Sequence, residues 1–80
     1  MTRKEGAMVN AMIEILDHPA AAGIAFIDIP AAYSPRTRCA LHEALTAHGF
    51  NLARVETESA HYTRTGDTAP ADAISEYLHQ

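Results

Sequence analysis

Arg38 and His42 stand four residues apart in the run Arg-Cys-Ala-Leu-His. On a helix this spacing places both side chains on one flank, with their Cβ atoms about 5–6 Å apart. The guanidinium is a planar fork of donors suited to phosphate oxygens, and an imidazole adds a donor that becomes cationic near about pH 6.5. Because both residues point away from the apolar stripe of the same segment, we expect them to face water or a ligand. The pair is a candidate anion-binding site, although solvated helix flanks often show the same spacing.

Three more arginines are candidate supporting cations. Arg36 falls in the first turn of the same predicted helix, where the helix dipole opposes a positive charge. Arg54 and Arg64 fall on two predicted strands and come together only if the hairpin places them on one face; otherwise we expect them to pair with neighbouring glutamates. Tyr33 and Tyr62 are of the type that stacks on bases of single strands, and core packing is the alternative that we favour for Tyr62.

The sequence shows no residue pattern that indicates a metal site or a catalytic site. Cys39 and scattered histidines do not form the two paired ligand sets of a structural zinc site. Ser34 and Ser59 lack an adjacent base motif, and the chain has no glycine-rich phosphate loop. We therefore expect no metal, no cofactor and no enzymatic activity.

The first half of the chain predicts a helix and a short strand. Thr2 and Glu5 form a capping-box pattern that starts a helix over residues 3–17, and Pro19 ends it. A β-branched and aromatic run then predicts a strand over residues 24–29. The apolar stripe of the predicted helix consists of Met8, Ala11, Met12, Ile15 and Leu16.

The second half predicts a helix, a hairpin and a last helix. Ser34 as N-cap and Pro35 at the first position start a helix that runs to about His48, with Gly49 just after it. Two strands follow over residues 50–58 and 60–65, and a last helix runs from about residue 70 to 79. The stripes of the two helices are Leu41, Ala44, Leu45 and His48 in the first, and Ala73, Ile74, Tyr77 and Leu78 in the second.

A helix as short as the last one is marginal unless its stripe is buried. We expect it to dock within its own subunit, over the open sheet face or a sheet edge; docking on a second copy is the alternative.

The order of these elements resembles that of the R-three-H domain, a single-stranded nucleic-acid-binding module. The residues that carry the resemblance are Ile29-Pro30, then Arg38 and His42-Glu43-Ala44, and then His48-Gly49-Phe50. The resemblance covers about residues 5–65. It implies an α+β fold in which a three-stranded antiparallel sheet carries two helices on one face, and it implies that Arg38 and His42 belong to a nucleic-acid surface. We therefore expect a domain over residues 1–66 and a helical extension over residues 67–80. Residues 58–61 depart from the glycine-rich link and basic residue that the family usually has there.

Length and charge set the limits of these expectations. Eighty residues allow one domain with a thin core, a small sheet covered by helices. Six basic residues against ten acidic ones give a formal net charge of −4, which argues against a general polyanion binder. Residues 30–66 nevertheless hold four arginines and three glutamates, a local charge of +1. A single cysteine and the lack of a long apolar run favour a cytoplasmic protein without a membrane anchor.

Two functional hypotheses follow. The first is a module that binds single-stranded DNA or RNA through phosphate contacts of Arg38, His42, Arg36, Arg54 and Arg64. The second is an acidic protein-interaction module, an inhibitor or adaptor, that keeps the fold and binds a basic protein partner. Either would be a monomer or a weak homodimer. A positive patch around Arg38 would favour the first hypothesis, whereas carboxylates bound to Arg38 and Arg54 would favour the second.

Overall fold

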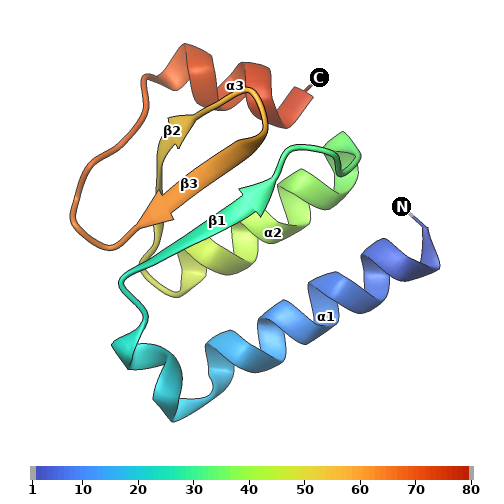
Figure 1. Ribbon diagram of the computed structural model, residues 1–80, viewed down its shortest axis with the longest axis vertical. Coiled ribbons are helices and arrows are strands. Elements are labelled where there is room, and N and C mark those ends of the chain that lie inside the picture. The colour runs from blue at the N-terminus through green and yellow to red at the C-terminus, as the bar shows by residue number, and fades with distance from the viewer. Residues whose placement is uncertain (1, 80) are drawn as a thin grey trace.

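The predicted order of helices and strands is confirmed by a computed structural model, which describes residues 2–79 (Figure 1). A 3₁₀ helix, η1, links the first helix to the first strand, and every strand is shorter than predicted. The elements are α1 (Arg3–Asp17), η1 (Pro19–Gly23), β1 (Phe26–Pro30), α2 (Pro35–Ala47), β2 (Asn51–Val55), β3 (Ser59–Thr63) and α3 (Ala71–His79).

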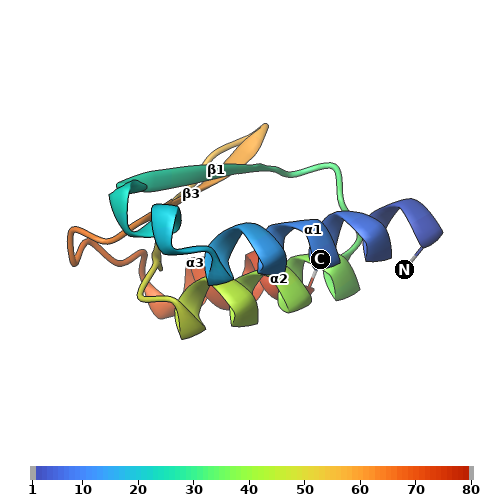
Figure 2. The same cartoon turned by 90° about the horizontal axis from the view of Figure 1, so that it is seen from below.

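The three strands form an antiparallel sheet in the order β1-β3-β2. Tyr62 of β3 lies opposite Ile27 of β1 and Leu52 of β2, and the β2 register shifts between Leu52 and Arg54. The helices α1, α2 and α3 lie on one side of the sheet, and within residues 2–79 no helix covers its other face (Figure 2). The α+β class is therefore confirmed, and the sheet has one open face.

The helices begin where the sequence predicts. The side chains and backbones of Thr2 and Glu5 exchange two hydrogen bonds of 3.1 Å in a complete capping box. The Glu5 carboxylate also accepts the N–H of Ser34, at 2.9 Å, and these hydrogen bonds, that of Ser34 first, lower the pKa of Glu5 to about 2. Ser34 caps α2, and Gly49 follows that helix with a φ of +88°, a conformation that suits glycine. Glu5 thus joins the starts of the first two helices.

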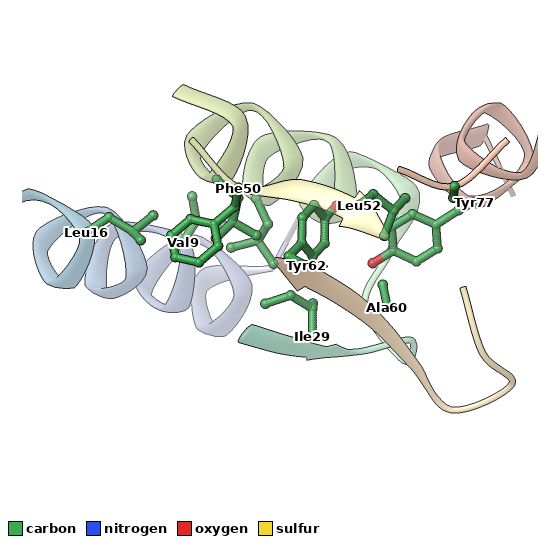
Figure 3. Packing of buried hydrophobic residues seen from close by; sticks show 11 residues of the cluster. Val9, Leu16, Ile29, Phe50, Leu52, Ala60, Tyr62 and Tyr77 are labelled. Atoms are coloured by element: carbon green, nitrogen blue, oxygen red, sulfur yellow. The ribbon is translucent and has the colours of Figure 1, made fainter. Parts of the chain in front are cut away.

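The core fills the space between the helices and the sheet. Leu45, Phe50 and Tyr62 are fully buried, and Figure 3 shows Tyr62 and Ile29 of the sheet pointing into the same interior as Leu16 of α1. Thr37 is also buried in this interior. The hairpin therefore supplies one wall of the core and α2 the other.

The predicted stripe of α1 is wrong in part. Val9 and Leu16 are the buried residues of this helix, whereas Ile15 is 52% exposed and Ala11 is exposed. The physical reason is position: α1 lies at the margin of the helical layer and packs against α2, so only a narrow strip of its surface is covered.

The last helix docks within its own chain, as predicted, at the β2 edge of the sheet. α3 packs against α2 and β2, and the N–H of Ala69 donates to the carbonyl of Leu52 at 2.7 Å. Tyr77 is 4% exposed and belongs to the same core cluster as Leu45 and Tyr62. Because α3 extends the helical layer beside α2, the opposite face of the sheet remains open (Figure 2).

Candidate interaction surface

Arg38 faces neighbouring backbone rather than open solvent, contrary to the prediction. Its two terminal nitrogens donate to the carbonyls of Ala31, at 2.5 Å, and Tyr77, at 3.1 Å. The guanidinium carbon lies 5.1 Å from the centre of the Tyr77 ring. Its Nε is buried and has no hydrogen-bond partner within residues 2–79. Arg38 therefore joins the start of α2 to the loop after β1 and to the last turn of α3.

His42 is also held from within the fold. Its Nδ1 lies 2.9 Å from the hydroxyl of Tyr62, and the two rings are 5.7 Å apart. Burial lowers the pKa of His42, which favours a neutral ring at this position. Burial likewise raises the pKa of Tyr62, so the phenol keeps its proton. The confirmed burial of Tyr62 removes it from the candidates for base stacking, and Tyr33 is half-buried against the core.

Arg64 closes the opposite end of the helical layer. Its guanidinium carbon lies 4.2 Å from the centre of the Phe50 ring. The side chain donates to four backbone carbonyls, which belong to Ala21, Ala22, Ile24 and His48. Arg64 thus ties η1 to the end of α2, which is a structural role.

The two remaining arginines lie at the surface. Arg54 forms an ion pair with Glu56, in which Nε lies 3.3 Å from the carboxylate, and both side chains are exposed. The hairpin places Arg54 opposite His61, so Arg54 and Arg64 are not paired across the strands. Arg36 is exposed and forms no hydrogen bond or ion pair with the other residues of 2–79. The five predicted residues do not form one continuous positive patch.

A different group of side chains lies on the open face of the sheet. Phe26 is 56% exposed, and its ring centre lies 5.4 Å from that of His61. The Nδ1 of His61 lies 2.5 Å from a carboxylate oxygen of Asp28, which is itself half exposed. Phe26 and Asp28 share a face because side chains two apart on a strand point the same way. We call this group, Phe26, Asp28 and His61, the open-face cluster.

The open-face cluster is not among the predicted site residues. The apolar run from residue 24 to 29 predicts a strand, but that prediction does not separate the two faces of the strand. Alternation alone places Phe26 and Asp28 opposite to Ile27 and Ile29, of which Ile29 is buried. The polar Asp28 was the available signal that this face meets solvent.

A groove lies between α1 and η1. It encloses about 430 Å³ and is mostly apolar. His18 at its rim accepts the N–H of Ala20 through Nδ1 and so caps η1. The lining consists of Ala11, Glu14, Ile15, His18, Ala20, Ala21 and Ile24.

Residues 2–79 contain no group of three or more histidine, cysteine, aspartate or glutamate side chains arranged to hold a metal ion. No helix in the same range is long and apolar enough to cross a membrane. Comparison of the chain with protein-family models, with curated proteins and with solved structures gives no match. Its resemblance to the R-three-H domain therefore stays a prediction from the sequence.

Proposed function

We propose that this chain is a non-catalytic binding module that docks on a basic protein partner through its open sheet face. The open-face cluster carries this proposal, because it places a half-exposed aromatic ring beside a carboxylate and an imidazole on a surface that no helix covers. Aromatic side chains are enriched at protein interfaces and often dominate their binding energy.

The charge distribution favours this partner over a polyanion. The net charge is −4, and such a charge steers a positively charged protein toward the chain. Arg38 and Arg64 donate to backbone carbonyls, and Arg54 is paired with Glu56. Three of the donors that a phosphate backbone would need are thus already bonded to other groups of the chain.

Single-stranded nucleic acid is the second candidate, and one observation favours it. The Phe26 and His61 rings lie together on an open sheet, and aromatic side chains on sheets stack on bases in several nucleic-acid-binding folds. In that case the exposed Arg54, which lies opposite His61, would supply a phosphate contact beside the stacked bases. Binding through so few contacts would weaken as salt concentration rises.

Affinity capture with the full chain tests the proposal. The immobilised protein is exposed to a cell lysate with and without nuclease, and the bound proteins are quantified against a Phe26→Ser variant. Ile15→Ser is the matched control, because Ile15 is about as exposed as Phe26 but lies on α1. We expect a basic protein at a fixed ratio to the bait, unaffected by nuclease, lost with Phe26→Ser and kept with Ile15→Ser.

A direct titration decides between the two candidates. A labelled single-stranded oligonucleotide is added to the purified chain at low and at moderate salt. Salt-sensitive binding of the oligonucleotide, together with nuclease-sensitive capture, would reject the protein partner in favour of nucleic acid.

A further inference from the structure

The open-face cluster has a defined set of hydrogen-bonding groups. The N–H at Nδ1 of His61 donates to one oxygen of the Asp28 carboxylate, and in this tautomer Nε2 is the acceptor of the ring. The second carboxylate oxygen of Asp28 accepts no hydrogen bond within residues 2–79, and the Asp28 side chain is 52% exposed to solvent. The Phe26 ring adds an apolar face beside these two acceptors.

This set matches one kind of side chain. A guanidinium is a planar cation with five N–H donors, and it stacks on aromatic rings. A phosphate or carboxylate would find only acceptors and a negative charge in the cluster. A lysine ammonium would satisfy the charge of Asp28, but it lacks the flat surface that covers a ring.

We infer that the open-face cluster binds an arginine side chain of the partner protein, whose guanidinium stacks on Phe26 and donates to Asp28 and to Nε2 of His61. This inference rests on the proposed docking function and names the chemistry of the partner. It accounts for the carboxylate of Asp28 on this face, which a nucleic-acid surface would not need.

The surrounding charges are compatible with a bound cation. Arg54 of β2 lies opposite His61, but Glu56 pairs with it. Asp28 and Arg54 lie on strands separated by β3, a distance of about 9.5 Å across two strand spacings. His61 is only one strand spacing from Arg54, and there the Glu56 carboxylate that pairs with Arg54 offsets its positive charge.

Titration of the full-length chain, followed by amide NMR, tests the inference. The probe is an acetylated and amidated alanine peptide that contains arginines, and a peptide with citrulline in their place keeps the planar group but loses the charge. We expect shifts centred on Phe26, Asp28 and His61, and no binding of the citrulline peptide. Asp28→Asn should weaken binding about ten-fold, the value of one charge-assisted hydrogen bond.

Two variants keep the test decisive. Asp72→Asn removes an exposed carboxylate from the first turn of α3 and should leave the affinity unchanged. Phe26→Leu keeps an apolar side chain but loses the aromatic ring, and it should weaken the arginine peptide about three-fold. Thermal melting shows that each variant is folded before it is titrated.

The outcomes separate this inference from the proposed function. An unchanged affinity in Asp28→Asn, or shifts away from the cluster, would overturn the arginine site even if a protein is captured through Phe26. An oligonucleotide that shifts the three residues while the arginine peptide does not would overturn it in favour of a base platform. Peptide binding at the cluster without any protein capture would support the site and reject the docking function.

Discussion

Replacing Arg38 by alanine should lower the free energy of unfolding more than replacing any exposed residue of α2. The substitution removes both hydrogen bonds to the carbonyls of Ala31 and Tyr77 and the contact with the Tyr77 ring. These three interactions join α2 to the loop after β1 and to α3. The substitution therefore weakens the packing of α2 against these two segments, rather than the helical propensity of α2 itself.

The magnitude follows from the contacts. A hydrogen bond from a charged donor contributes about 1.5–3 kcal/mol, and a partly exposed cation–π contact about 0.5–1 kcal/mol. Against this, the buried and unpartnered Nε of Arg38 costs about 1–3 kcal/mol, and the alanine variant is relieved of it. We expect the free energy of unfolding to fall by about 2–4 kcal/mol, a large part of the total for a chain of this size.

Urea unfolding followed by circular dichroism measures this change. Arg36→Ala is the matched control, because Arg36 lies two positions earlier on the same helix and is exposed, and we expect a change within about 0.5 kcal/mol. Arg38→Lys should recover only part of the stability, since an ammonium cannot span both carbonyls as the planar fork does. A loss below about 0.5 kcal/mol in Arg38→Ala would refute this account and would return Arg38 to the candidate ligand-binding residues.

Two further predictions concern the ends of the helical layer. The hydrogen bond from His48 to the carbonyl of Ala44 and the bond to Asp17, each 2.9 Å, raise the pKa of His48. The stabilisation by His48 is therefore complete below about pH 6.5 and is lost as the pH rises through the raised pKa. The difference in the free energy of unfolding between wild type and His48→Gln, measured by urea unfolding across this range, should therefore shrink at alkaline pH. A difference that grows with pH would contradict this. Tyr77→Ala should cost about 3–5 kcal/mol, because Tyr77 is 4% exposed. Its melting temperature should not depend on protein concentration, and a temperature that rises with concentration would show that α3 docks on a second copy.

The elements themselves could be predicted because their signals are local. The capping box of Thr2 and Glu5, the N-cap at Ser34 and the positive φ at Gly49 depend on residues within one turn of each other. The strand ends were less accurate, and Pro30 shows why. Pro30 is itself the last residue of β1, whereas the sequence predicts that the strand ends before it. An edge strand tolerates a proline because the missing N–H points away from the neighbouring strand.

The environment of Arg38 could not be predicted, because a distant segment decides it. Its position on α2 is that of a solvated flank until α3 packs beside it, 39 residues later in the chain. The apolar stripe of α3 indicated that it would be buried, but not which surface would cover it. Arg64 was misjudged for the same reason: its acceptors lie on η1 and at the end of α2, more than one element away.

The two faces of the sheet have different environments, and Phe26 is an apolar residue on the face that meets solvent. The covered face needs apolar volume, and Ile29, Leu52 and Tyr62 supply it with almost no exposed surface. The open face needs polar side chains, and Asp28 and His61 meet that need. A strand position at this face would accept a threonine equally well, since β-branched residues suit a pleated, half-buried surface. A phenylalanine there leaves more than half of its side chain in water, which lowers solubility and adds little to folding. This exposed ring, with a carboxylate beside it on the same face, is therefore the observation on which the proposed docking of a positively charged partner depends.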